Sequence, residues 1–140
     1  MRTIIVIVIA FCLLCAISIS HKEHNTFKRI FYKKEVVTAT MYNAVEGQCD
    51  SDPYVTAGGY KINPKKASKH HWIAVSRDML KRWGGKLKYG DRVKIQNAHH
   101  KNGIYRVVDT MNKRFTKRID FLETKGTSLY RYENVLLAKI

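Results

Sequence analysis

Residues 103–122 read GIYRVVDTMNKRFTKRIDFL and hold two strand-type runs joined by a basic loop. Runs rich in Val, Ile, Tyr and Thr that are bounded by Gly, Asn or Asp predict β-strands, here over 103–110 and 118–122. Asp109 and Asp120 stand eleven residues apart in these two runs. The basic side chains between them are Lys113, Arg114, Lys117 and Arg118. The question is whether the two acids only neutralise a basic surface or form a site.

Further strand signals lie on both sides of this stretch. They cover residues 36–42, 72–76, 92–98 and 134–140. Only residues 76–83 look helical, with Met79, Leu80 and Trp83 on one side and a Gly84-Gly85 stop. Six short strands and one short helix predict a mainly β protein, a small closed barrel over residues 36–140.

The N-terminal segment, residues 1–20, has the anatomy of a secretory signal peptide. Arg2 supplies a basic start, residues 4–17 are almost continuously apolar, and Ser18 and Ser20 suit a peptidase that cuts after Ser20. The sequence therefore predicts a secreted, periplasmic or envelope protein whose mature chain begins with a basic linker, residues 21–35.

An uncleaved anchor is the alternative interpretation of this segment. Residues 4–19 approach the ~20 residues that span a bilayer, and the basic linker resists export under the positive-inside rule. Membrane attachment through this segment therefore stays open. Cleavage removes Cys12 and Cys15, so Cys49 has no internal disulfide partner, and we expect it to be a small buried residue.

The chain carries a formal net charge of +15, which predicts attraction to anionic polymers. For an exported protein these are cell-wall glycan with its peptide and phosphate decorations, or the outer leaflet of a membrane. Nucleic acid would fit the charge only if the chain were not exported. We therefore expect a monomer whose partner is peptidoglycan or another anionic wall glycan, and no nucleic acid.

Six segments follow one another in the order found in double-psi β-barrels. They are TATMYNA (38–44), VTAGGYKINPKKA (55–67), WIAVSRD (72–78), KYGDRVKI (88–95), YRVVDT (105–110) and KRID (117–120). Over residues 36–140 the chain resembles the three-aspartate (3D) domains of secreted bacterial wall proteins. It is also similar to rare lipoprotein A and to the barrel of membrane-bound lytic transglycosylase A. The resemblance implies a six-stranded double-psi barrel that carries a groove for a β-1,4-linked glycan, with peptidoglycan as the expected substrate.

The same resemblance implies roles for the two aspartates. In the family one aspartate lies in a turn, and a second follows eleven positions later in an R-I-D-like strand, an interval that Asp109 and Asp120 reproduce. Asp120 is then the catalytic acid/base and Asp109 supports it. The third aspartate of the pattern corresponds most nearly to Asp78. From the residues alone, Asp109 could instead cap its turn and Asp120 could satisfy backbone groups at a strand end.

Other residues of the expected groove would bind substrate. Tyr42 matches an aromatic of the family's TAY strand and would stack on a sugar, although ordinary barrel packing explains it equally well. Thr40 and Thr56 would line the groove, and Arg118 lies two residues from Asp120 on the same strand face. Asp91 we interpret as a turn residue.

Two function classes fit this pattern. A lytic transglycosylase-like enzyme needs one carboxyl group that is protonated near neutral pH, because the sugar's own 6-hydroxyl is the nucleophile. A non-catalytic, expansin-like wall-binding module is the alternative, since Met111 and Asn112 replace the family's glycines after the first aspartate. No cofactor is expected. No metal is expected either, because adjacent histidines in the pairs His70-His71 and His99-His100 would point to opposite strand faces, and no Cys or carboxylate completes a ligand set.

Overall fold

The computed structural model describes residues 34–45 and 52–140. The predicted signal peptide or anchor, most of the predicted linker and Cys49 lie outside these residues. Lys34–Ile140 form one compact unit. In the part of the chain that the structure describes, no helix is both long enough and apolar enough to cross a membrane.

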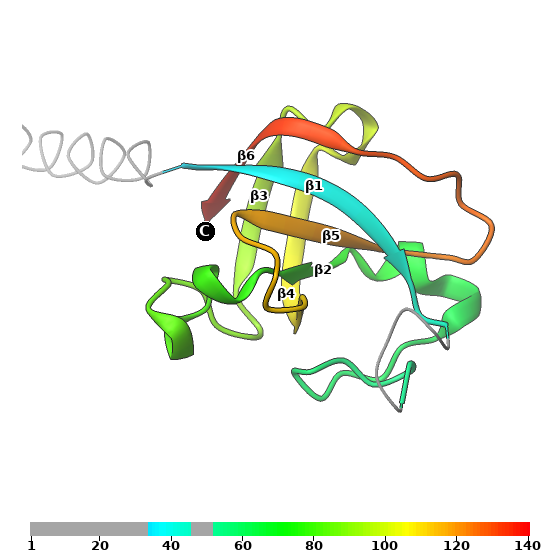
Figure 1. Ribbon diagram of the computed structural model, residues 1–140. Helices are drawn as coiled ribbons and strands as arrows, with labels where there is room; N and C mark the ends of the chain where they lie inside the picture. The colour runs from blue at the N-terminus through cyan, green and yellow to red at the C-terminus, as the bar shows by residue number, and fades with distance from the viewer. Residues whose placement is uncertain (1–33, 46–51) are drawn as a thin grey trace, which may run out of the picture. The chain divides into compact units, whose positions relative to one another are not determined.

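Six strands close into a barrel, as the strand pattern predicts (Figure 1). The strands are β1 (Glu35–Asn43), β2 (Trp72–Val75), β3 (Arg92–Gln96), β4 (Gly103–Thr110), β5 (Arg118–Glu123) and β6 (Tyr132–Lys139). Their order around the barrel is β1-β5-β2-β4-β3-β6. Two neighbouring pairs, β1 with β5 and β2 with β4, run parallel, and the other pairs run antiparallel.

The barrel interior is filled by alternate residues of its strands. Ile73 and Val75 on β2 and Ile119 and Phe121 on β5 are almost completely buried. The ring of Phe121 meets the ring of Tyr105 edge-on, with 4.9 Å between the centroids. Because successive strand residues point to opposite faces, this inward set forces Ala74 and Asp120 to the outer face of the barrel.

The predicted helix over residues 76–83 is wrong as a single element. Two short 3-10 turns, η2 (Arg77–Met79) and η3 (Lys81–Trp83), stand there instead. Leu80 between them is extended, with ψ 140°, and is buried together with Met79. Backbone N–H groups of Lys86 and Leu87 both bond to the Met79 carbonyl oxygen. The apolar pair is therefore held inside a folded-back loop and cannot extend into a helix.

Among the described residues, the longest helical element is η1, a 3-10 helix over Pro64–His70. Its cap is Asn63, whose side chain accepts the backbone N–H of Lys65 at 3.1 Å. Pro64 suits the first helical position because it has no N–H to leave unpaired. A further 3-10 turn, η4 (His99–Lys101), joins β3 to β4.

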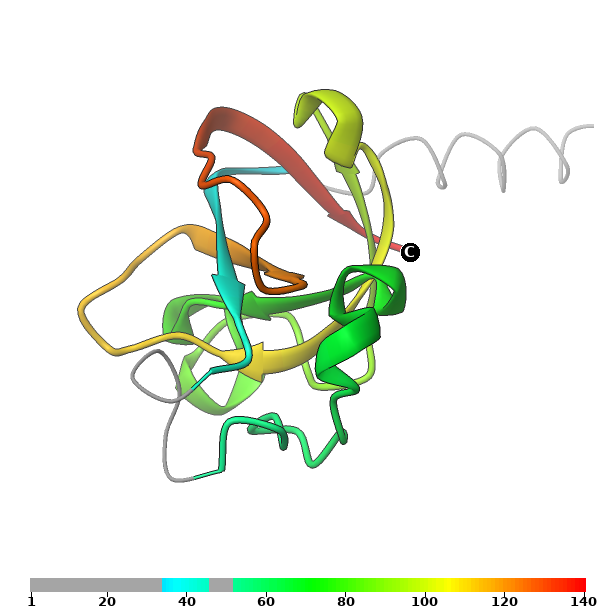
Figure 2. The ribbon, with the colours of Figure 1, turned by 90° about the vertical axis from the view of Figure 1, so that its right-hand side faces the viewer.

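The segment before η1 runs along the outside of the barrel beside the end of β4 (Figure 2). The backbone N–H of Gly58 donates to the Val108 carbonyl oxygen at 2.9 Å. A Cβ atom at position 58 would lie 2.6 Å from that oxygen. Glycine therefore permits the close approach that brings this segment onto the outer face of β4.

Candidate functional site

Asp109 and Asp120 belong to strands on either side of β2 and pair in register with the same residue, Ala74. On the next strand along, Thr40 of β1 pairs with Asp120. Neighbouring strands lie about 4.8 Å apart, so the Cα atoms of the two aspartates are separated by about 10 Å. The small side chain of Ala74 leaves the space between the two carboxyl groups open.

An irregularity in the pairing of β2 with β4 brings Asp109 to this position. Ile73 pairs with Val107, but Ala74 pairs with Asp109, so Val108 is an extra residue on β4. Such bulges are frequent beside functional sites because they re-aim a side chain. In a regular register that continued from the pair Ile73–Val107, Asp109 would pair with Val75, whose side chain lies in the barrel interior.

Three donors converge on the Asp109 carboxylate and fix its orientation. Its Oδ1 accepts the backbone N–H groups of Ala57 at 2.9 Å and of Thr110 at 2.8 Å. Its Oδ2 accepts the Tyr42 hydroxyl at 3.2 Å. Asp109 is therefore anchored by segments from three parts of the chain. Its charge also acts on the nearby Tyr89, whose pKa is raised first by burial and second by the charge of Asp109.

Asp120 has a different environment. Burial raises the pKa of its carboxyl group above the usual range, and this outweighs the opposite effects of the Thr40 hydrogen bond and the Arg118 charge. The Thr40 hydroxyl donates to Oδ1 of Asp120. The guanidinium of Arg118 lies over the Phe115 ring, 4.7 Å from its centroid. A raised pKa favours the protonated acid, which is the form that a general acid needs.

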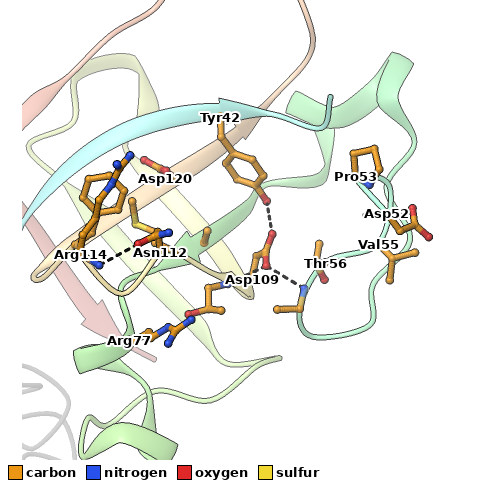
Figure 3. A pocket seen from close by; sticks show the side chains of 15 residues that line it. Tyr42, Asp52, Pro53, Val55, Thr56, Arg77, Asp109, Asn112, Arg114 and Asp120 are labelled. Atoms are coloured by element: carbon orange, nitrogen blue, oxygen red, sulfur yellow. Dashed lines mark hydrogen bonds between the residues drawn. The ribbon is translucent and has the colours of Figure 1, made fainter. Parts of the chain in front are cut away.

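Both carboxyl groups open into a cavity of about 430 Å³ (Figure 3). Segment 52–57 and the loop between β4 and β5 form its walls. The wall residues from the loop are Met111, Asn112, Arg114 and Phe115. Within this loop Asn112 accepts the backbone N–H of Arg114 at 3.1 Å, which closes a tight turn. Met111 and Asn112 therefore form part of the cavity wall.

The structure brings together most of the site residues expected from the sequence. Tyr42, Thr56, Asp109 and Asp120 line the cavity. The Oγ1 of Thr56 accepts the backbone N–H of Tyr60 at 3.1 Å, so this threonine also closes a turn.

Three expected residues are not among those that line the cavity. Thr40 and Arg118 act on Asp120 from outside it. Asp78 accepts the backbone N–H of Lys117 at 3.1 Å, which ties η2 to the start of β5. Asp91 caps the turn before β3, accepts the backbone N–H of Lys88 at 3.0 Å and pairs with Lys139, as expected of a turn residue.

Sequence reasoning missed the parts of the site that have no recognisable pattern of side chains in the sequence. The Ala57 donor to Asp109 is a backbone group, and the only hint of it is the Gly58-Gly59 pair beside it. Arg77 and Arg114 line the cavity although neither was expected in the site.

Among the described residues, no group of three or more His, Cys, Asp or Glu side chains is placed to hold a metal ion. A scan against family models and a search of curated proteins found no match for this chain.

Proposed function

We propose that the chain is an exported cell-wall protein that cleaves peptidoglycan glycan strands by a lytic transglycosylase-like reaction. Asp120 is the acid/base of this proposal. The observation that carries it is the environment of that carboxyl group: it opens into a cavity beside a second, anchored carboxylate, and burial raises its pKa. That combination of burial and a charged neighbour in a cleft is typical of a catalytic acid.

The proposed reaction needs only one such group. Protonated Asp120 gives its proton to the glycosidic oxygen, and the bond from that oxygen to the anomeric carbon of muramic acid breaks. The 6-hydroxyl of the same sugar attacks the anomeric carbon, and the Asp120 carboxylate accepts the hydroxyl proton. The products are a 1,6-anhydro sugar and a free 4-hydroxyl, with no water consumed. The acid is restored at the end of each turnover.

The remaining site residues position the glycan in this proposal. Tyr42 presents an aromatic ring at the cavity and holds Asp109 through its hydroxyl. Asp109 then keeps segment 52–57 against the cavity through the Ala57 N–H. Thr40 and Arg118 tune the protonation of Asp120.

The fold supports the assignment to the double-psi family of barrels. The described strands form a closed six-stranded barrel in which two neighbouring pairs are parallel. The two aspartates, eleven residues apart in the sequence, come from the two strands that flank β2. Both aspartates line one cavity, which supports the proposal of a shared fold and site.

Location and partner follow from the N-terminal sequence and the charge. The apolar run and small residues of 1–20 support export with cleavage or anchoring, and the net charge of +15 supports binding to an anionic wall glycan.

The direct test is to incubate the purified full chain with peptidoglycan and to analyse the soluble products by mass spectrometry. The proposal expects muropeptides that end in 1,6-anhydro sugars, which are lighter by one water than hydrolysis products. Products with free reducing ends would assign a hydrolase instead.

A non-catalytic wall-binding module is the second candidate. The buried Met111 and the partly buried Phe115 narrow the cavity on the side where the family carries glycine. Sedimentation of the chain with wall sacculi, together with no soluble product of any kind, would select this candidate.

A further inference from the structure

An exposed loop at one end of the barrel carries a tryptophan among cations. The loop covers residues 81–88 and includes η3, and we call it the basic loop. Its exposed side chains are Lys81, Arg82, Trp83, Lys86 and Lys88. Among the described residues, no acidic side chain forms an ion pair with any of these four cations. The basic loop therefore presents uncompensated positive charge around a large aromatic ring.

The backbone of the basic loop is fastened to the barrel. The N–H of Lys81 donates to the Leu87 carbonyl oxygen at 2.7 Å, and the N–H of Leu87 donates to the Met79 carbonyl oxygen at 2.9 Å. Leu80 and Leu87, on either side of the exposed residues, are buried. Because these contacts already fix the loop, a partner would meet its side chains at a small further cost in ordering.

The ring of Trp83 lies among guanidinium groups at the surface. It is 40% exposed, and the Cζ of Arg82 lies 4.3 Å from its centroid and that of Arg77 5.2 Å. A surface tryptophan with cations beside it suits the boundary between the head groups and the acyl chains of a bilayer. The amphipathic ring is stable at that level, and the cations meet the lipid phosphates.

The basic loop lies at the end of the barrel where the described chain begins. Figure 1 shows the start of β1 and the η2–η3 region at the same end. Lys117 connects them, because its Nζ pairs with Glu35 at 2.8 Å and its backbone N–H donates to Asp78 of η2 at 3.1 Å. Before Lys34 the sequence holds the basic linker and the apolar segment that is expected to be a signal peptide or anchor. Linker residues 21–33 can extend at most about 45 Å, so an anchored chain would keep this end within reach of the bilayer.

We propose that the basic loop docks on an anionic phospholipid surface, with Trp83 at the level of the head groups. Lys81, Lys86 and Lys88 supply the attraction to lipid phosphates, and Arg82 holds the ring. One basic residue near an anionic membrane surface favours binding by about fivefold. No residue of the basic loop lines the cavity that holds the two aspartates. Docking is therefore a property separate from the candidate site and does not depend on glycan cleavage.

Quenching of Trp83 fluorescence by brominated phospholipids measures this contact, because bromine quenches only at close range. Trp72→Phe in the full chain leaves Trp83 as the one tryptophan. The protein is mixed with vesicles of brominated phosphatidylcholine, either alone or in an equal mixture with phosphatidylglycerol. Quenching should be strong in the anionic vesicles and weak in the neutral ones, and it should fall as the salt concentration rises. Insertion of the N-terminal segment would occur in both kinds of vesicle, so the difference between them reports the barrel.

Two matched triple variants separate the basic loop from the net charge. The loop variant combines Lys81→Gln, Lys86→Gln and Lys88→Gln. It should lower the ratio of docked to free barrel about a hundredfold, so that quenching in anionic vesicles falls to the neutral level. The control variant combines Lys65→Gln, Lys66→Gln and Lys69→Gln. It removes the same charge from exposed positions on η1, at the other end of the barrel in Figure 1, and should keep the quenching.

Two results overturn the proposal. The first is equal quenching of Trp83 in neutral and anionic vesicles, or quenching in neither, which needs no charge variant. The same measurement on the natural chain and on Trp83→Phe gives the Trp83 signal by difference, if Trp72→Phe fails to fold. The second is an equal loss of quenching in the two triple variants, because the attraction would then follow the net charge alone.

Other partners of the basic loop have their own outcomes. Protection of Trp83 from acrylamide by wall sacculi or by duplex DNA, without quenching by anionic vesicles, would overturn the lipid assignment in favour of that polymer. Quenching without glycan cleavage supports the docking and removes the proposed catalysis. Cleavage without quenching does the reverse.

Discussion

Asp109 and Asp120 face one another across a single residue, Ala74, with which each pairs in register from a neighbouring strand. Their roles differ because their surroundings differ. Three donors anchor Asp109, whereas Asp120 receives one hydroxyl donor and has a pKa that burial raises. A fixed carboxylate beside a carboxyl group with a raised pKa is an arrangement that acid–base catalysis can use.

The space above Ala74 is the first feature to test. Ala74→Val adds two methyl groups between the carboxyl groups, so glycan binding and cleavage should each fall about tenfold or more. Because Ala74 is almost fully buried, the added methyl groups should also lower the free energy of unfolding by about 1–3 kcal/mol. Ala138→Val is the matched control on β6 and should leave binding intact. Unchanged glycan affinity in Ala74→Val would place the ligand elsewhere.

The contact of Gly58 with β4 gives a second prediction. In Gly58→Ala the new Cβ would lie 2.6 Å from the Val108 carbonyl oxygen, so segment 52–57 must shift and Asp109 loses its Ala57 donor. We expect a loss of about 1–3 kcal/mol in denaturant unfolding, together with weaker glycan binding.

The control for this substitution is Gly126→Ala. Gly126 has φ +93° and no heavy atom within 4 Å of an added Cβ, so it reports only backbone strain, about 1–2 kcal/mol. It should not affect glycan binding. Equal binding by the two variants would show that the approach of segment 52–57 is unimportant for the site.

Arg118 provides a test through pH. Its positive charge lowers the pKa of Asp120 and so opposes the effect of burial. Arg118→Gln removes that charge, and the pKa of Asp120 should rise further. Since the proposed reaction begins with protonated Asp120, the alkaline limb of the pH–rate profile should move to higher pH. A limb that stays in place, or that moves to lower pH, would mean that another group controls the limb.

The same raised pKa predicts a pH-dependent stability. At pH below the unfolded-state pKa, Asp120 is protonated in both states and its contribution to stability is fully present. The contribution is lost as the pH rises through the folded-state pKa. Asp120→Asn should therefore be at least as stable as the wild-type protein at pH 7, with the advantage disappearing in acid. Thermal unfolding of both proteins at a series of pH values measures this, and an Asp120→Asn variant that is less stable than the wild-type protein at pH 7 but equally stable in acid would contradict it.

The strands of this fold could be predicted from the sequence because alternation is a local property. Residues 103–110 coincide with β4, and the five other runs differ from their strands by a few residues at the ends. The helix predicted over 76–83 is wrong because Met79 and Leu80 meet the core through a folded-back loop, which local periodicity does not reveal. Pro64 after Asn63 was a usable signal for η1.

The candidate site could be predicted only where its residues carry their chemistry in side chains of a known spacing. Asp109 and Asp120 could be predicted in this way. The bulge at Val108 could not be predicted, because two adjacent valines fit either face of a strand. The Ala57 donor could not be predicted either, since a backbone N–H has no sequence signature. Arg77 belongs to the site through the packing of η2, which depends on tertiary contacts with Trp83.

The central claim, that Asp120 is the acid/base, is tested most directly by measuring anhydro-muropeptide formation in Asp120→Asn. Asparagine keeps the size and can still accept the Thr40 hydroxyl, but it can neither donate nor accept the catalytic proton. The control is Asp91→Asn, which removes a carboxylate outside the cavity; it should lower stability, because Lys139 loses its partner, and keep the rate. The account predicts that Asp120→Asn still folds and binds peptidoglycan while its rate falls by roughly 10²–10⁴-fold. A folded Asp120→Asn protein that forms anhydro products at the wild-type rate would contradict it.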